Sequence, residues 1–288
     1  MIINLSIMSE EQLIAEAILQ LKQESSILKD YLFPITMALF SSFVGACAGY
    51  LVYLRQEKMA AERRKLDIIN KWILIADEIH QSLLSIKLNY YGSLTSDPYQ
   101  RFLAIPSIVG TEKKYQYDYH ELVFITDCEN IKWLNVGYLR TLFANYDTLL
   151  SLWNIRNEFN EKVRIQFFKS DDDNIAYIDL SDSEIETKIN QSDLSCLIDL
   201  TERCLRLSDD LIIEFYKFLD EFPKAVSKKI DLKLTKNHGF ILNIDMKKNK
   251  AIQSLLAESP LPDYKKFRKF QDVQKKNLWQ DIKSYLNR

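Results

Sequence analysis

The chain has 288 residues, of which 47% are hydrophobic and 27% are charged. This length and composition exclude a disordered chain and a small disulfide-stapled domain, because there is enough apolar material for a sizeable core. With only six glycines and six prolines, the sequence also disfavours a turn-rich sandwich or barrel and any nucleotide-binding fold built on a glycine loop. The net charge of −2 hides an uneven distribution of charge along the chain.

The first predicted element is an amphipathic helix over residues 9–29. Ser9 is a suitable N-cap residue, and Gln12 follows it at the spacing of a capping box. The apolar residues of the segment recur at helical spacing. The sequence leaves open whether this helix lies on the outer membrane surface, pairs with copies of itself or is a short solvated helix.

Residues 31–54 form the strongest signal in the sequence, because these 24 residues carry no charge. At about 1.5 Å per residue a helix of this length spans about 36 Å, which exceeds a hydrocarbon core of about 30 Å. A cleaved signal peptide fits less well, since an acidic segment of about 30 residues comes first and signal peptides have short apolar stretches. A buried helix of a soluble protein is a further alternative. The sequence therefore predicts one transmembrane helix.

The distribution of Lys and Arg predicts the orientation of this helix. Residues 16–30 contain two of these cations and residues 55–69 contain five. Because the more basic flank stays in the cytoplasm, we expect the N-terminus outside and the larger C-terminal part inside, which for a bacterial protein means the inner (cell) membrane. The four cysteines form no CxxC pair, which is typical of free thiols in a reducing compartment.

Small residues recur at one position of every helical turn inside the predicted span. Ser41, Gly45 and Gly49 are four residues apart, so they share one face of the helix, and the two glycines form a GxxxG motif. Small residues let two helix backbones approach closely in lipid. The face therefore predicts self-association into a homo-oligomer, with a plain monomeric anchor as the alternative.

The remaining pattern predicts a bundle of long helices. The helix of the span continues to about Tyr90, with its apolar stripe at Leu66, Ile69, Ile73, Ala76 and Leu83. His80 lies on this face, which is typical of a core or interface residue with satisfied hydrogen bonds rather than a ligand. An irregular connection follows over residues 92–119.

Two further long helices are predicted after this connection. A capping box, Thr126 to Glu129, is expected to open a helix that runs to about Phe168. Another helix is expected from Asp193 to Phe222, closed by Pro223. Weaker patterns suggest a short strand at 174–180, an irregular basic stretch at 224–246, and helices at 247–257 and 263–286.

No recognised catalytic or ligand-binding motif occurs in the sequence. The phosphate-binding and dinucleotide-binding glycine motifs, the HExxH zinc motif and the GxSxG nucleophile motif are all missing. The acidic run at 171–173 lacks the later ligands of a calcium loop. We therefore assign no catalytic, cofactor-binding or metal-binding residue. An enzyme with an unrecognised site remains an alternative in which the acids on the long helices converge, namely Asp147, Glu158, Asp209 and Asp210.

The C-terminal quarter is strongly basic. Residues 224–288 contain 16 Lys and Arg against 6 Asp and Glu, a net charge of +10. The densest part interleaves cations with aromatic residues, and its cations are Lys265, Lys266, Arg268 and Lys269. These four are the candidate lipid- or nucleic-acid-facing residues. The helix that carries them could dock on the acidic bundle, lie on the anionic inner leaflet, or bind nucleic acid through phosphates and stacking.

Taken together, these patterns predict a mainly α fold. A single N-terminal transmembrane helix leads into a cytoplasmic multi-helix bundle. The expected divisions are an extracytoplasmic amphipathic segment (1–30), the transmembrane helix (31–54), the cytoplasmic bundle (55–223) and a basic helical region (224–288).

The leading functional hypothesis is a self-associating membrane protein without a recognisable catalytic site. It would act as a sensor, a scaffold or a membrane-perturbing effector of the bacterial defence or toxin type, an analogy of architecture alone. The lipid bilayer and a second copy of the chain are the expected partners. The main alternative is a membrane-tethered nucleic-acid-binding module that uses residues 263–288.

Overall fold

A computed structural model of the chain shows a mainly helical protein, as the sequence predicts, with no strand among the described residues. The chain divides into two compact units, residues 1–61 and residues 62–288. The structure describes residues 9–23, 27–109, 115–126, 131–168, 185, 189–246 and 250–264. The predicted strand at 174–180 and nearly all of the predicted C-terminal helix lie outside these residues.

The first unit contains helix α1 (Glu10–Gln23), the π-helical turn Leu28–Leu32, and the beginning of α2 (Phe33–Leu88). The backbone N–H of Ser9 donates to Oε1 of Gln12 over 3.3 Å, which is one half of the predicted capping box. Helix α1 is described as far as Gln23, residues 24–26 lie outside the described residues, and helical structure is present again from residue 27.

Helix α2 is one continuous helix of 56 residues, so the prediction that the apolar helix continues to about Tyr90 is confirmed. The predicted stripe within the second unit is buried, with Ile69, Ile73 and Ala76 fully inaccessible. A turn after Leu88 ends the helix, and Gly92 in this turn has φ of +79°. This left-handed conformation favours glycine because a Cβ atom would be strained there.

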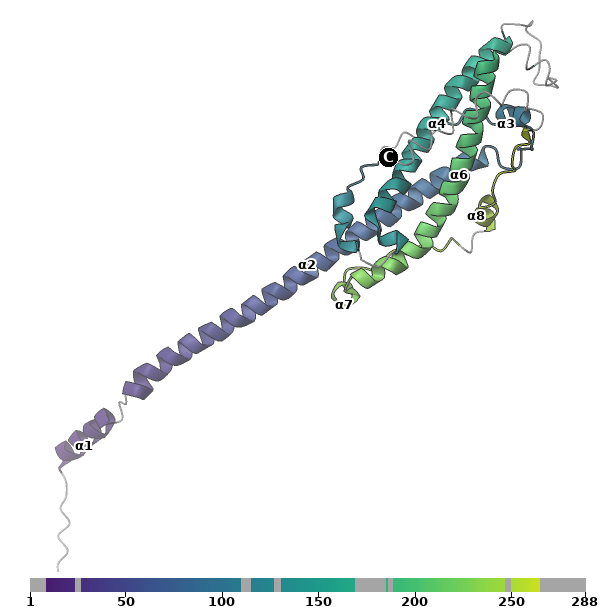
Figure 1. Cartoon of the computed structure of the whole chain (residues 1–288). Coiled ribbons are helices and arrows are strands. Elements are labelled where there is room, and N and C mark those ends of the chain that lie inside the picture. Colours follow the sequence, from purple (N-terminus) through teal and green to yellow (C-terminus); the bar gives the residue numbers. More distant parts are fainter. Residues whose placement is uncertain are drawn as a thin grey trace, which may run out of the picture. The chain divides into compact units, whose positions relative to one another are not determined.

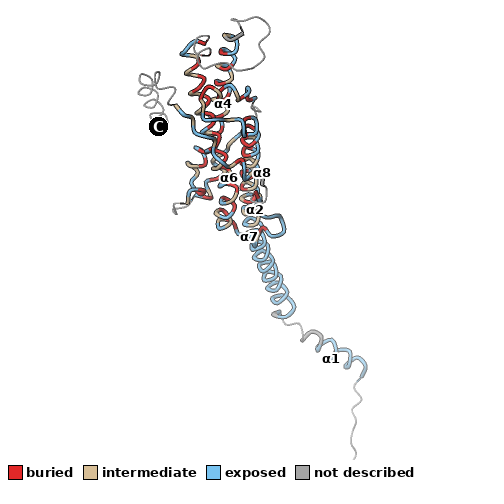
Figure 2. The backbone as a smooth tube through the Cα atoms, turned by 90° about the vertical axis from the view of Figure 1, so that its right-hand side faces the viewer, coloured by how far each residue is buried: buried red, intermediate tan, exposed pale blue. Residues whose placement is uncertain are grey.

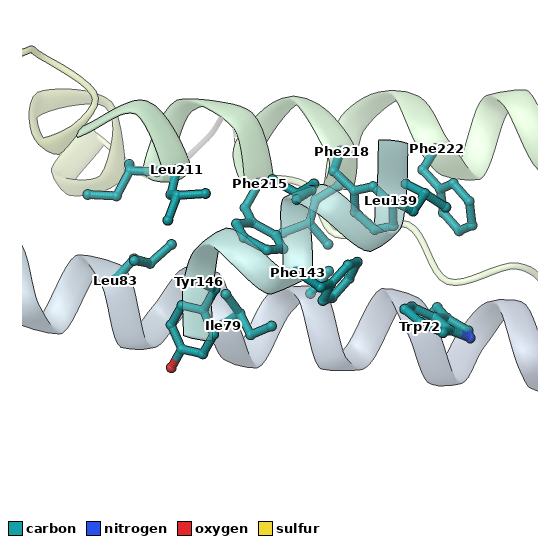
Figure 3. Packing of buried hydrophobic residues seen from close by; sticks show 14 of the residues in the cluster. Trp72, Ile79, Leu83, Leu139, Phe143, Tyr146, Leu211, Phe215, Phe218 and Phe222 are labelled. Carbon is teal, nitrogen blue, oxygen red and sulfur yellow. The ribbon is translucent and has the colours of Figure 1, made fainter. Parts of the chain in front are cut away.

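Three long helices form the core of the second unit: α2, α4 (Val136–Phe168) and α6 (Gln191–Val226). Figure 3 shows their apolar side chains meeting between the ribbons. The ring of Phe143 on α4 lies 5.1 Å from Trp72 on α2 and 5.3 Å from Phe215 on α6, both edge to face. Edge-to-face pairs at this spacing add to the stabilisation by area burial, so one aromatic ring joins all three helices.

The start of α4 differs from the prediction. The helix begins at Val136, ten residues after Thr126, which instead follows the 3₁₀ turn Tyr119–Ile125. Residues 127–130 are outside the described part. A second 3₁₀ turn (Lys132–Leu134) comes first, and Oδ1 of Asn135 then accepts the N–H of Tyr138 over 3.1 Å. Asn135 is therefore the N-cap of α4, and the described part of this helix extends to Phe168, after which the described residues stop.

Two prolines also behave differently from the prediction. Pro223 does not close α6, which continues to Val226, because a proline near the end of a helix removes only one backbone hydrogen bond and its neighbours remain packed in the core. Pro98 opens a short helix, α3 (Pro98–Ala104), inside the connection predicted as irregular. Asp97 caps this helix, since its Oδ1 accepts the N–H of Tyr99 over 2.9 Å.

The basic stretch after α6 contains only short elements. They are the 3₁₀ turn Ser227–Lys229 and helix α7 (Leu232–Thr235), followed by helix α8 (Lys250–Leu255) within the predicted 247–257. Figure 1 shows α7 near the end of the second unit where residues 62–70 of α2 lie, whereas α3 lies near the other end.

Candidate functional site

The first part of α2 is an exposed apolar surface. Every residue from 31 to 53 is exposed, and the large apolar side chains Leu39, Phe40 and Phe43 are between 63% and 67% exposed. Figure 2 shows this part of α2 in pale blue throughout. By length and composition the helical stretch Lys29–Leu88 could span a membrane, and none of its most apolar 18-residue window is buried within the structure.

The predicted small-residue face lies on this exposed segment. A Cβ atom added to Gly45 or Gly49 would meet nothing within 4 Å. The hydroxyl of Ser41 donates to the carbonyl of Ala38 over 3.1 Å, so its proton is satisfied within the helix. The structure thus places Ser41, Gly45 and Gly49 together on an uncovered face, where a second helix can approach closely.

The second unit contains a buried ion pair that the sequence analysis did not anticipate. Nζ of Lys87 on α2 lies 2.6 Å from Oδ1 of Asp209 on α6, and the two side chains are 3% and 8% exposed. Lys87 also donates to the carbonyl of Ala257 over 2.6 Å, and the other carboxylate oxygen of Asp209 accepts the N–H of Ser259 over 2.7 Å. The pair therefore holds the segment after α8 against two long helices.

A second buried pair acts on the same segment. Arg101 on α3 binds both carboxylate oxygens of Glu202 on α6, over 2.6 and 2.9 Å. A bidentate arrangement of this kind fixes both partners in orientation as well as distance. Arg101 also donates to the carbonyl of Pro260 over 2.6 Å. We call residues 257–263 the C-terminal strap; its last residue donates its N–H to the carbonyl of Ser96 over 2.7 Å.

Arg156 is a third buried cation, and its partners are neutral. Its guanidinium donates to the carbonyls of Phe102 and Ile105, each over 2.8 Å, and to that of Pro106 over 3.0 Å. Burial lowers the pKa of Arg156 to about 10, so it remains a cation at neutral pH. Carbonyls at the end of a helix lack partners within the helix, and Arg156 supplies donors to those at the end of α3.

The sequence pattern did not reveal these buried cations, because each of them stands in an otherwise apolar helical stripe. Lys87 continues the stripe of α2 after Leu83, and Arg156 follows Trp153 on α4. A charged residue at a buried position of a helical pattern is a usable signal, since such residues are almost never fully buried without a partner. Their donors are taken up by carboxylates and backbone carbonyls, so the cluster is built to hold chain segments together.

The acids that the sequence suggested could converge do not form a metal-binding group. Among the described residues there is no cluster of three or more His, Cys, Asp or Glu side chains able to hold a metal ion. Asp209 is engaged by Lys87, whereas Asp147 lies beside Tyr117. Burial raises the pKa of Asp147 and that of Asp210.

His80 is a core residue, as predicted, but the hydrogen bonds expected of its side chain are not found among the described residues. Its side chain is fully buried, its ring lies 6.4 Å from that of Tyr216, and neither ring nitrogen has a hydrogen-bond partner within the described part of the chain. Burial lowers the pKa of His80 to about 4, because an imidazolium is unfavourable in an apolar environment. His80 is therefore neutral in the folded protein at physiological pH.

The other predicted site residues are Lys265, Lys266, Arg268 and Lys269, and they lie outside the described residues. The structure reaches as far as Tyr264, which packs against a small apolar cluster around Tyr99 and Phe102. Comparisons of the chain with models of protein families, with curated proteins and with solved structures find no match.

The Lys87–Asp209 pair leads to a stability prediction. Replacing Lys87 with Met should lower the free energy of unfolding by about 3–5 kcal/mol, because the Asp209 carboxylate stays buried without its partner. The double variant Lys87→Met with Asp209→Asn should recover a large part of this loss. Urea unfolding of the full chain in detergent, followed by tryptophan fluorescence, measures both values.

The matched control is Lys71→Met on the same helix. Lys71 pairs with Glu121 over 2.8 Å, but its side chain is 46% exposed, so its removal should change stability by less than about 1 kcal/mol. Equal losses of unfolding free energy for Lys87→Met and Lys71→Met would contradict the assigned role of the buried pair. So would a loss in the double variant equal to the sum of the losses of Lys87→Met alone and Asp209→Asn alone.

His80 leads to a prediction about pH. The pKa of this residue is about 4 in the folded protein and about 6.5 in an unfolded chain. Between these values the unfolded state binds a proton that the folded state does not, so stability falls as the pH falls from 6.5 to 4. The total loss from this group is about 3 kcal/mol.

The variant His80→Leu lacks this titration. Urea unfolding at several pH values between 7 and 4 should therefore show the free energy of unfolding of the unmodified chain falling by about 3 kcal/mol relative to that of the variant as the pH falls. Carboxylates shared by both chains cancel in this difference. The prediction is wrong if the difference in unfolding free energy between the two chains is the same at every pH. In that case unfolding would not change the protonation of His80 in this range.

Proposed function

We propose that the protein is a single-pass membrane protein that self-associates through its transmembrane helix and presents a helical bundle in the cytoplasm. Within the class of sensors, scaffolds and membrane-perturbing effectors, we favour a scaffold. The observation that carries the proposal is the continuous exposure of apolar residues 31–53 on α2. Full burial of a large apolar side chain stabilises by about 1.5–3 kcal/mol, so this helix strongly favours an apolar environment.

A lipid bilayer matches the backbone of this segment as well as its side chains. In hydrocarbon every backbone N–H and C=O group must be paired within the protein, which a continuous helix achieves. Helix α2 runs without interruption from Phe33 to Leu88, and residues 31–54 carry no charge. The five cations among residues 55–69 support an orientation with the second unit in the cytoplasm.

Self-association is supported by the uncovered small-residue face. Apolar burial gives no net drive between helices in lipid, whereas close backbone packing does. Ser41, Gly45 and Gly49 provide a face without bulk, and the space beside both glycines is open. The second unit supports the scaffold role, because the N–H groups of its buried cations donate to backbone carbonyls and so connect segments of the chain.

The topology gives the first test of this proposal. Reporter domains placed before Met1 and after Arg288 of the full chain should show the N-terminus outside and the C-terminus in the cytoplasm. The protein should also stay with the membrane after extraction at alkaline pH, because insertion does not depend on surface charge. A chain released by this extraction, or a C-terminal reporter active only outside, would refute the proposed anchor or its orientation.

Assembly gives the second test. Replacing both Gly45 and Gly49 with Leu adds bulk where two backbones should meet, yet keeps the segment apolar, so insertion should persist while the oligomer is lost or rearranged. Crosslinking in membranes and mass measurement in detergent report the oligomer. The matched control replaces Phe43 and Cys47 with Leu, which lie on the opposite face of the helix. An oligomer unchanged by the Gly45/Gly49 substitutions would leave α2 as a plain anchor.

A further inference from the structure

The end of the second unit that carries α7 has a feature that plays no part in the proposed function. Here the chain after α6 folds back onto the first turns of α2 within this unit. The N–H of Asp231 donates to Glu62 over 2.8 Å, and the side chain of Asn70 joins both Phe240 and Leu242 through hydrogen bonds of 3.0 and 2.9 Å. Residues 231–242 are thus fixed beside residues 62–70.

An open groove of about 560 Å³ lies between the end of α6 and this returning segment. Its lining combines apolar side chains with lysines. They include Lys224, Leu232, Lys236, Phe240 and Asn243. Two of the apolar side chains extend into solvent, since Phe240 is 74% and Leu232 is 45% exposed.

The segment from the end of α6 to Phe240 is positively charged, and two of its lysines, Lys224 and Lys236, line the groove. Residues 224–240 contain five lysines and one acid, Asp231. Lys224 pairs with Asp220 over 2.9 Å. Lys228, Lys233 and Lys236 are exposed and have no ion-pair partner in the described part of the chain.

The surface next to the groove carries acids. A smaller hollow of about 240 Å³ adjoins the groove and shares Lys224 and Asn243 with it, but it is lined by the acids Asp220 and Asp245. An anionic ligand is therefore directed to the part of the groove beside Lys236 and Phe240, where cation and apolar surface lie together.

We propose that this groove binds the headgroup and upper acyl region of an anionic phospholipid in the cytoplasmic leaflet. Lysines near an anionic membrane surface attract it, and exposed aromatic and apolar side chains insert at the boundary between headgroups and acyl chains. The inference rests on the proposed membrane anchor. Glu62 follows Leu54 by eight residues, which reach at most about 28 Å even when fully extended, so the groove is tethered close to the bilayer.

A phospholipid fits this surface better than the two other anionic ligands. A free phosphate ion would contact the lysines but not the apolar side chains of the groove. A nucleic acid would favour several stacking platforms along a cationic track, whereas among the residues that the structure describes Phe240 is the one aromatic residue that lines the groove.

The experiment uses the full chain in detergent and native mass spectrometry with phosphatidylglycerol as the probe. Each lysine near an anionic surface gives roughly a fivefold preference. The variant Lys233→Gln with Lys236→Gln removes one lysine that lines the groove and one on the adjoining helix α7, and it should bind phosphatidylglycerol about 25-fold more weakly. The matched control, Arg140→Gln with Lys162→Gln, removes two exposed cations from α4 and should leave the affinity unchanged. Phe240→Ser should weaken binding without any change of charge.

Two comparisons make the result decisive. Phosphatidylcholine should bind much more weakly than phosphatidylglycerol, and inorganic phosphate should not compete with the lipid. Equal loss in the groove and control variants, equal binding of the two lipids, or full competition by phosphate would each overturn the inference. The proposed anchor fails separately, when the full chain is released from membranes at alkaline pH, so the two failures are distinguishable.

Discussion

The burial of the apolar stripe of α2 against α4 and α6 is the interaction on which the rest of the second unit depends. Phe143 sits between Trp72 and Phe215 and sets the spacing of all three helices. Side chains of this size pack in a limited number of ways at interior density. Once the three helices are held in register, Lys87 faces Asp209 and Asn70 faces the returning segment.

The buried ion pairs then determine where the chain after α8 lies. Burying a charge is costly, and a buried pair is often no more stabilising than well-packed apolar residues of similar size. Both pairs have a geometric consequence, because each also binds the C-terminal strap through a backbone group. Ala257 and Pro260 accept from the two cations, and Ser259 donates to Asp209. The strap thus fixes the point from which the basic residues after Tyr264 continue.

The sequence predicted most of this core because helical periodicity is a local property. The positions of the stripe on α2 could be listed from residues 66–90 alone, and each of them is buried. The extension of one helix from the apolar segment to Leu88 followed from the absence of Gly and Pro between residues 50 and 91.

The candidate sites were less predictable, for two physical reasons. The partners of Lys87 and Arg101 are more than 100 residues away in sequence, so no local pattern identifies them. Helix ends depend on a competition between weak caps. Thr126 begins a suitable capping box, yet Asn135 caps α4 because the 3₁₀ turn at 132–134 places its side chain beside the N–H of Tyr138. The small-residue face, by contrast, needs only a spacing of four residues and was apparent at once.

The distribution of charge is consistent with the proposed anchor even though residues 55–223 are acidic, with 20 Lys and Arg against 29 Asp and Glu. Salt screens exposed charges over about 8 Å at physiological ionic strength. A bilayer surface therefore responds to the charges nearest to it and scarcely to the net charge of a whole bundle. The cations nearest in sequence to the proposed span are Arg55, Lys58, Arg63, Arg64 and Lys65, and the fold adds the lysines around α7 beside residues 62–70.

A basic end and an acidic remainder would orient the second unit at an anionic surface, since the near end is attracted while the acidic faces are repelled when they approach. In this arrangement the tether supplies proximity and the charge asymmetry supplies orientation, which are the two requirements for a groove at the α7 end to meet a lipid headgroup.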